Sequence, residues 1–280
     1  MHIGVPLFML RPEQMADVAV RAEALGFESV WVAEHLVFPV AIRSRYPYAA
    51  EGVPPINPAT PLLDPLLVLM QVAARTRRIR LGTNVYILPL RHPIAVARMV
   101  TTLDVLSGGR VSFGVGAGWL AEEFEAVGLD FTARAGRMRA GVQALRALWG
   151  EDEPTVANRH FTFGPVKFEP KPVQRPHPPI LIGGESAAAL RRAAEIGDGW
   201  YGVGHTPASA AAQVARLRQL RDAAGRAGLP FECTVSHTGE LTRDDVARYA
   251  EAGVDRVVSL PWRRAREADA ALASLAERVL

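Results

Sequence analysis

The chain alternates between two hydrophobic patterns. Apolar runs rich in β-branched residues predict strands, and segments with apolar positions three and four residues apart predict helices. A helical segment follows each apolar run, which is the element order of a (β/α)8 barrel of the α/β class. We therefore expect residues 1–280 to form one domain. The runs begin near His2, Glu28, Arg78, Arg110, Ile180, Gly199, Phe231 and Arg256.

Glycines punctuate the predicted helices. We expect each helix to end in a left-handed cap, the usual role of glycine before a tight return to a sheet. The predicted helices and their stops are residues 12–25 with Gly26, 186–196 with Gly197, 207–227 with Gly228, and 242–252 with Gly253.

The stretch from Arg78 to Trp119 predicts a strand, a helix and a second strand. The first strand covers residues 79–88, and Pro93 lies in the opening turn of the helix, where a missing N–H is tolerated. The second strand covers residues 111–115 and leads into Gly116, Ala117 and Gly118. Because alternate glycines let another molecule approach the backbone, we expect a cofactor here, although a plain tight turn remains possible. The third glycine of the dinucleotide-binding fingerprint is absent.

Two insertions interrupt the regular spacing. Residues 36–65, after strand 2, carry seven prolines together with Tyr46 and Tyr48. A connection this long is usually functional, so we favour a lid over the barrel mouth, with a spacer as the alternative. Residues 155–179, between strands 4 and 5, contain an alternating segment with a Gly-Pro turn that predicts a hairpin beside the barrel. The prolines are Pro39, Pro47, Pro54, Pro55, Pro58, Pro61 and Pro65.

Composition limits the classes of function. The single Cys233 forms no disulfide framework, and no uncharged apolar run is long enough to span a bilayer, so we expect a cytoplasmic protein that does not enter membranes. The net charge is +3, and the arginines are interspersed with Glu, Asp and Ala rather than forming blocks. Nucleic-acid binding is therefore not expected.

Four histidines follow the predicted ends of strands 2, 3, 6 and 7: His35, His92, His205 and His237. A metal site is one interpretation, but the chain lacks the spacings of known zinc motifs, and we expect no metal. The other interpretation makes His35, with Glu34 nearby, a catalytic proton donor or acceptor. A strand-end histidine bonded to the backbone is equally compatible with the sequence.

A second glycine turn follows strand 5, where Gly183, Gly184 and Glu185 lead to Ser186. Ser186 can cap the next helix, and the exposed N–H groups of a helix start can bind phosphate. An ordinary strand-to-helix turn would look the same.

Taken together, these motifs resemble the bacterial luciferase-like flavin and deazaflavin oxidoreductases over nearly the whole chain. The resemblance implies a TIM barrel with a redox cofactor laid across its C-terminal face, and a cis peptide bond between Asn84 and Val85 that supports the central ring. It further implies a cofactor wall at residues 116–118 and cofactor phosphate binding at residues 183–186. The segments that carry it are GFESVWVAEH, LGTNVYILPLRHP, LSGGRVSFGVGAGW, RAGRMRAGVQALRALW, FEPKPVQRPHPPILIGG and GDGWY.

His35 aligns with the active-site histidine of the deazaflavin-dependent sugar-phosphate dehydrogenases in this group. Those enzymes place a glutamate after the strand 4 glycines, where this chain has Trp119, so the same proton relay and substrate do not follow. The resemblance implies an oxidoreductase that uses coenzyme F420 on a small organic substrate and assembles as a homodimer or homotetramer. An FMN-dependent monooxygenase is the nearest alternative, and a cofactor-binding protein with little catalysis is the alternative of another class.

Overall fold

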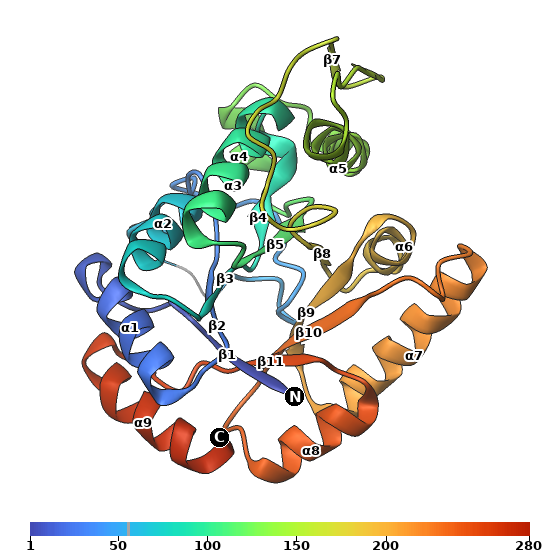
Figure 1. Cartoon of the computed structure of the whole chain (residues 1–280). Coiled ribbons are helices and arrows are strands. Elements are labelled where there is room, and N and C mark those ends of the chain that lie inside the picture. Colours follow the sequence, from blue (N-terminus) through green and yellow to red (C-terminus); the bar gives the residue numbers. More distant parts are fainter. Residues whose placement is uncertain (55–56) are drawn as a thin grey trace.

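Parallel strands form a closed ring at the centre of the computed structural model, which describes residues 1–54 and 57–280. Pro55, counted above in the segment after strand 2, lies outside the described residues. The eight long strands pair in the order β3, β2, β1, β11, β10, β9, β8, β5, and pairing of β3 with β5 closes the barrel (Figure 1). The predicted (β/α)8 fold is therefore confirmed. The strands are β1 His2–Pro6, β2 Ser29–Val32, β3 Arg80–Thr83, β4 Tyr86–Ile87, β5 Val111–Gly116, β6 Val156–Ala157, β7 Thr162–Phe163, β8 Ile180–Gly183, β9 Gly199–His205, β10 Glu232–His237 and β11 Arg256–Val258.

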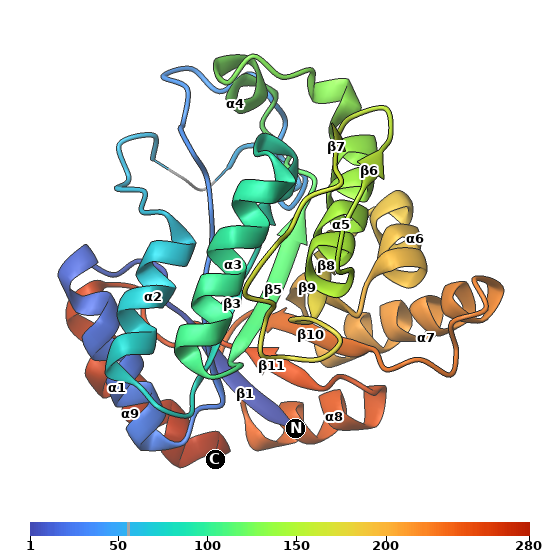
Figure 2. The ribbon, with the colours of Figure 1, turned by 45° about the horizontal axis from the view of Figure 1, so that its top comes forward.

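Helices pack around the outside of the barrel and bury their apolar faces against the strands (Figures 1 and 2). The short helix α4 is the exception, because it lies at the barrel mouth on the same side as the segment between β2 and α2 (Figure 2). The helices are α1 Met15–Leu25, α2 Pro65–Arg75, α3 Pro93–Ser107, α4 Ala121–Ala126, α5 Arg134–Gly150, α6 Ala187–Ile196, α7 Pro207–Ala223, α8 Arg243–Ala252 and α9 Ala268–Val279. Among residues 1–54 and 57–280, no helix is long and apolar enough to cross a membrane.

A small cluster of side chains fills the inside of the barrel, and Trp31 is its largest member, with Leu181, Tyr201 and Val258. Trp31 on β2 is fully buried, and its indole N–H donates to the Ser29 hydroxyl at 2.9 Å. A Cβ atom at Gly82 on the neighbouring strand would lie 2.3 Å from the indole ring, so only glycine leaves room for it. The barrel is thus packed with side chains below its mouth and is not a pore.

The predicted glycine caps form at two helix ends and fail at two others. Gly26 and Gly253 adopt the predicted left-handed conformation at the ends of α1 and α8. The prediction was wrong at Gly197, which is extended, with φ −85°, and so enters β9 directly. It was also wrong for α7, which ends at Ala223 rather than at residue 227 because the chain already turns at Gly225, with φ +67°.

Two predicted strand boundaries also change. The run from residue 79 to 88 is not one strand but splits into β3 and β4 around residues 84 and 85. The hairpin in the second insertion exists, but its turn is not the Gly-Pro sequence. The turn lies between β6 and β7, where the Asn158 side chain accepts from the N–H groups of His160 and Phe161, and Gly164 follows the hairpin instead.

Candidate active site

The side chain of Val85 lies between Gly116 and Gly183 at the barrel mouth. The peptide bond between Asn84 and Val85 is cis, as the resemblance implied. A Cβ atom would meet the Val85 methyl groups at 2.5 Å if placed on Gly116 and at 2.7 Å if placed on Gly183. The space that these two glycines leave is therefore filled by Val85 and not by an approaching ligand, which corrects the reason given above for the glycines. What a ligand can meet is the half-buried Val85 itself.

The two neighbours of Gly116 complete this wall. Ala117 is half-buried and packs against the core. Gly118 has φ +82°, a conformation that favours glycine, and a Cβ atom there would meet the Phe124 ring at 2.8 Å. The turn therefore brings the start of α4 back over the end of β5.

His35 lies at the end of β2 and pairs with a residue that the sequence did not suggest. Its Nδ1 atom is 3.1 Å from Oε2 of Glu123, which is fully buried on α4 and whose other oxygen accepts from the Leu36 N–H at 2.5 Å. A carboxylate can only accept, so Nδ1 carries the proton and Nε2 of the neutral imidazole keeps the lone pair. Glu123 thus fixes both the orientation and the tautomer of His35.

Glu34, expected to assist His35, has other partners. It is buried, accepts from the Ile87 N–H at 2.5 Å and contacts the guanidinium of Arg91. Burial is the main effect on this carboxyl and raises its pKa to about 7, against the opposing influence of Arg91 and the Ile87 N–H. The structure therefore places Glu34 against Ile87 and Arg91 rather than in a pair with His35.

A row of aromatic rings leads away from His35 across the mouth. His35 stands edge-on to Trp119, with ring centroids 5.6 Å apart, and Trp119 meets Tyr46 at 5.0 Å. Tyr46 in turn contacts Tyr48 at 5.3 Å. These spacings are those of favourable aromatic pairs, so residues from β2, the β5 turn and the long segment form one wall.

The long segment after β2 is held to α4 by Glu122. Its Oε1 accepts from the N–H groups of Arg43 and Ser44, and its Oε2 accepts from the Ser44 hydroxyl at 2.6 Å. Burial opposes ionisation of Glu122, but these hydrogen bonds outweigh it and lower its pKa to about 2. The segment therefore crosses the mouth with a defined anchor.

The second glycine turn, between β8 and α6, divides two environments. The Ser186 hydroxyl accepts from the Ala189 N–H and so caps α6 as predicted, and the first turn of α6 holds no acidic residue. Gly184 has φ +119° and lies next to the Tyr48 hydroxyl. The Glu185 carboxylate is turned toward β9: it accepts from the Val203 N–H at 2.8 Å and lies 3.0 Å from Nε2 of His205.

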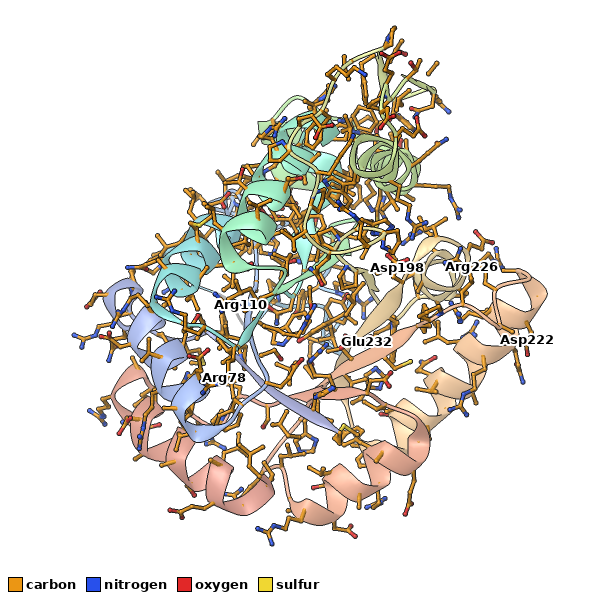
Figure 3. All side chains as sticks on the ribbon, viewed as in Figure 1. Arg78, Arg110, Asp198, Asp222, Arg226 and Glu232 are labelled. Carbon is orange, nitrogen blue, oxygen red and sulfur yellow. The ribbon has the colours of Figure 1, made fainter. Side chains whose placement is uncertain are left out.

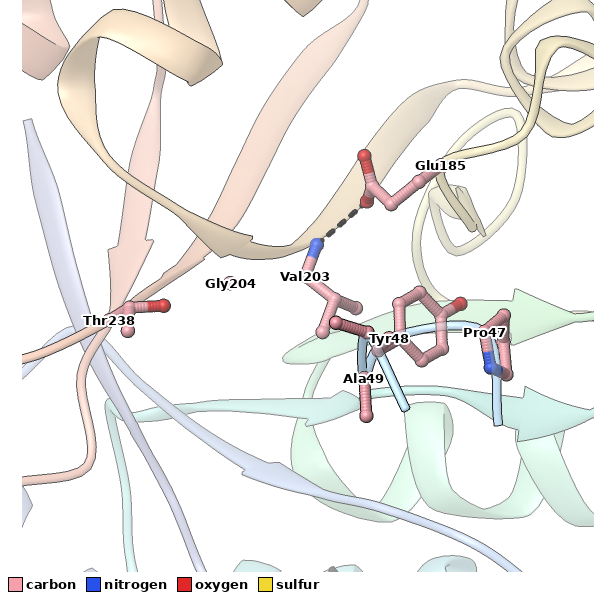
Figure 4. Close-up of a pocket in the computed structure, with 8 residues that line it drawn as sticks. Pro47, Tyr48, Ala49, Glu185, Val203, Gly204 and Thr238 are labelled. Atoms are coloured by element: carbon pink, nitrogen blue, oxygen red, sulfur yellow. Dashed lines mark hydrogen bonds between the residues drawn. The ribbon is translucent and has the colours of Figure 1, made fainter. Parts of the chain in front are cut away.

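A cavity of about 560 Å³ opens beside this turn (Figure 4). It lies between the long segment and the ends of β9 and β10. The volume is typical of a small-molecule site. The lining residues are Pro47, Tyr48, Ala49, Ala50, Glu185, Val203, Gly204 and Thr238.

The other histidines do not gather around one point. His92 caps α3 and faces the Phe161 ring, His205 pairs with Glu185, and His237 lies 2.9 Å from the Tyr249 hydroxyl. In the part of the chain that the structure describes, no three His, Cys, Asp or Glu residues are grouped as ligands for a metal ion.

Basic residues that the sequence did not single out lie on α5 and α6. Arg134, Arg137 and Arg192 are half-buried, and burial lowers the pKa of each. The neighbouring charges on Arg192 are those of Arg139 and Arg134, which add to this lowering. The motif RAGRMRAG contained the signal, since arginines clustered at a helix start are typical of an anion site.

These features fit a flat redox cofactor with an anionic tail. Val85 and the aromatic row offer apolar surface for rings, and Oδ1 of Asn84 is buried without a hydrogen-bond partner among the described residues, so it can accept one from a ligand. The capped start of α6 and the three arginines supply positive charge for a phosphate.

Comparison with known proteins supports the same assignment. The family model described as "Luciferase-like monooxygenase" matches residues 6–278. An uncharacterised protein of Mycobacterium tuberculosis is 37% identical over 285 residues, covering 100% of this chain and 99% of that protein. Among solved structures, an F420-dependent secondary alcohol dehydrogenase superposes with a TM-score of 0.79 at 17% identity, covering 99% of this chain and 98% of that one.

Two named relatives use different cofactors. The F420-dependent glucose-6-phosphate dehydrogenase of Amycolatopsis mediterranei is 30% identical over 193 residues, 68% of this chain and 53% of that enzyme. The FMNH2-dependent dimethylsulfone monooxygenase of Pseudomonas putida is 33% identical over 138 residues, 48% of this chain and 38% of that enzyme. The match across residues 6–278 shows that this chain belongs to the luciferase-like monooxygenase family, whose members are monooxygenases and other oxidoreductases that use F420 or FMN.

Proposed function

We propose that this protein is an F420-dependent oxidoreductase that transfers a hydride between the deazaflavin and a small organic substrate. The observation that carries the proposal is the imidazole of His35, fixed through Nδ1 by the buried Glu123 and standing edge-on to Trp119 at the barrel mouth. F420 or FMN, when bound, would supply the hydride chemistry. The protein would hold the ring against residues 84, 85 and 116–118, and the phosphate near residues 183–186.

In this proposal His35 moves the proton that accompanies the hydride. The neutral tautomer set by Glu123 leaves Nε2 free to accept a proton from a substrate hydroxyl, and the charged form returns it to a carbonyl oxygen. Glu123 stabilises the imidazolium formed in the first case. Glu34 acts indirectly, because it holds the Ile87 N–H and so the chain that follows Val85.

The alternative cofactor is FMN, as in a monooxygenase. The match to the F420-dependent relative covers 68% of this chain and the match to the FMNH2-dependent relative covers 48%, which favours F420. Titration of the purified protein with each cofactor, followed by absorbance, tests the choice. We expect F420 to bind at least about tenfold more tightly, a difference of about 1.4 kcal/mol. Equal or tighter binding of FMN would reverse the assignment.

We also propose that the protein assembles as a homodimer or homotetramer. Leu67 on α2 is 70% exposed, and Val40 and Val53 in the long segment are 100% and 67% exposed. Large exposed apolar side chains are candidates for burial at an interface. Sedimentation velocity of the full chain measures the assembly state, and a monomer at all concentrations would contradict the proposal.

A further inference from the structure

The cavity beside the β8–α6 turn has a charge pattern that the cofactor does not explain. Glu185 is the ionised residue of its lining, and the described lining residues include no lysine, arginine or histidine. Any phosphate or carboxylate placed there would face the Glu185 carboxylate, because His205, the basic partner of Glu185, lies behind it and not in the lining. Such a like-charge contact in a partly desolvated site is unfavourable.

The Glu185 carboxylate is held in place from behind. Oε1 accepts from the Val203 N–H at 2.8 Å (Figure 4). Oε2 lies 3.0 Å from Nε2 of the buried His205, whose other nitrogen is 3.0 Å from the Ser209 hydroxyl. Each carboxylate oxygen has a further lone pair beyond these bonds. Since the side chain remains 26% exposed, those lone pairs are available to a donor in the cavity.

The remaining polar groups of the cavity are hydroxyls. Burial, and then the charge of Glu185, raise the pKa of Tyr48 to about 12, so its phenol stays neutral and can donate and accept. Thr238 supplies a second hydroxyl, and Pro47, Ala49 and Val203 supply apolar surface. One fixed acceptor, two adaptable hydroxyls and an aromatic wall suit a ligand that carries several hydroxyl groups and no charge.

The other side of the same turn is basic. Arg192 on α6 and Arg134 on α5 are neighbours, and neither lines the cavity. An anionic cofactor tail is therefore favoured on the α5–α6 side of residues 183–186. The cavity on the β9–β10 side is left for a different molecule.

We propose that this cavity binds the substrate through an uncharged, hydroxyl-bearing part, and that Glu185 makes it reject phosphorylated forms of the same compound. The role as substrate pocket rests on the proposed function, whereas the selectivity between neutral and anionic ligands does not. The pocket thereby separates this protein from the relative named as a glucose-6-phosphate dehydrogenase.

Three matched probes test the selectivity: D-glucose, glucose 6-phosphate and glucosamine. Their dissociation constants are measured by ligand-observed NMR with the full chain, first alone and then with F420 added. We expect glucose to bind at least about tenfold more tightly than glucose 6-phosphate. Glu185→Gln should shrink that ratio to about one, because it removes the charge but keeps the shape. Thr238→Val should weaken the binding of glucose without strengthening the binding of glucose 6-phosphate.

Glu195→Gln is the control, because it removes the same charge from α6 at an exposed ion pair with Arg139, outside the cavity. It should leave all three constants unchanged. Unchanged melting temperatures of the variants exclude unfolding as the cause of any loss. Glucose 6-phosphate binding as tightly as glucose, glucosamine binding more than about tenfold tighter than glucose, or no binding of glucose at any soluble concentration would each overturn the proposal.

The cofactor titrations keep the two proposals apart. Normal F420 binding with a preference for the phosphorylated sugar would refute the pocket assignment alone. Sugar selectivity without binding of F420 or FMN would refute the proposed function alone.

Discussion

Each end of the barrel holds a contact between an arginine and a glutamate, but the pKa of the glutamate is lowered at one end and raised at the other. The closed end is where β2, β10 and β11 begin. Arg256 donates two hydrogen bonds to Glu28 there, at 2.7 and 2.8 Å. Arg256 also contacts Glu232, at the start of β10 (Figure 3). At the mouth, Arg91 contacts Oε1 of Glu34 through one nitrogen, Nη2, and its Nη1 has no hydrogen-bond partner in the described part of the chain.

This difference in hydrogen bonding decides the charge states. Burial raises the pKa of both carboxyls, but at Glu28 the hydrogen bonds and charge of Arg256 prevail, and the pKa falls below its usual value. At Glu34 burial prevails, and the pKa rises to about 7. An arginine nearby is therefore not sufficient: the bidentate geometry keeps the closed end ionised, and its absence leaves the mouth titratable near neutral pH.

The largest effect should come from His35→Ala, which tests whether the mouth is the reacting end. We expect turnover to fall by about 10² to 10⁴ with a much smaller change in cofactor affinity, because loss of a general acid or base acts on the reacting complex. Steady-state kinetics with F420 and an identified substrate measures it. His2→Ala is the control, since His2 is exposed at the start of β1, which pairs with the start of β11 at the closed end. Unchanged turnover would make His35 structural and would favour a binding protein.

Glu123→Gln sharpens this test, because Glu123 is assigned as a positioning residue. Its loss should lower turnover less than the loss of His35 and should shift the pH profile of turnover. The double variant should be no slower than His35→Ala alone, since both act through one imidazole. Additive losses would show that the two residues act separately.

Arg256→Met should give the largest loss of stability. The substitution leaves the partly buried Glu28 and Glu232 without their cation, and breaking such a pair costs about 3–5 kcal/mol. Urea unfolding measures the change, and Arg256→Lys should lie in between because lysine cannot bind bidentately. Arg21→Ala, which removes an exposed pair with Asp269, should cost no more than about 1 kcal/mol. Equal losses at Arg256 and Arg21 would contradict the comparison.

Glu34 should make the protein less stable as the pH rises toward neutrality, which is opposite to the effect of a glutamate whose pKa is lowered by folding. The native carboxyl binds its proton more tightly than the unfolded one, whose ordinary pKa is 4.5, so the free energy of unfolding should fall as pH rises from 4.5 to about 7. The loss should reach about 3 kcal/mol and be complete above that range. Glu34→Gln should remove this slope in urea titrations between pH 4 and 8, whereas Glu28 contributes in the opposite sense at lower pH. An identical slope in both proteins would refute the assignment.

Much of the fold could be predicted because it depends on local pattern. Each barrel strand begins within two residues of its predicted start, since β-branched runs and glycine stops are short-range signals. The end of α6 at Ile196 was predicted correctly, but the extended conformation of Gly197 was not, because a glycine that enters a strand directly looks the same in sequence as one that caps a helix. The end of α7 at Ala223 was missed because Gly225 and Gly228 are both possible stops.

The site depends on contacts that sequence spacing does not reveal. His35 and Glu34 are adjacent in sequence, so they were paired, yet successive residues at a strand end point in different directions and the real partner, Glu123, is 88 residues away. Likewise the glycines at 116 and 183 were expected at the mouth, but their common neighbour Val85 lies between β3 and β4, distant from both in sequence. The cis bond was found through the resemblance, not through local pattern.

The smallest effect concerns the segment over residues 36–65, which we still expect to act as a lid. Glu122 and Glu123 anchor its first part to α4, and Tyr46 and Tyr48 lie along the aromatic row. Prolines restrict the free chain as well as the ordered one, so closing the segment over a ligand costs little entropy. Excluding water from the mouth would then protect the hydride chemistry.

Hydrogen exchange should therefore slow modestly in this segment when F420 and substrate bind. The change should be greatest around Tyr46 and Tyr48, and small near Ser44, where Glu122 already holds two N–H groups. Glu122→Gln should raise exchange at residues 43 and 44 in the free protein, because a neutral amide is a weaker acceptor than a carboxylate. Strand β1, whose residues do not line the cavity, serves as the internal reference. If exchange in residues 36–65 is identical in free and bound protein while the strand-end turns change, the segment is a fixed wall. Closure of the segment would then play no part in excluding water from the reactive mouth.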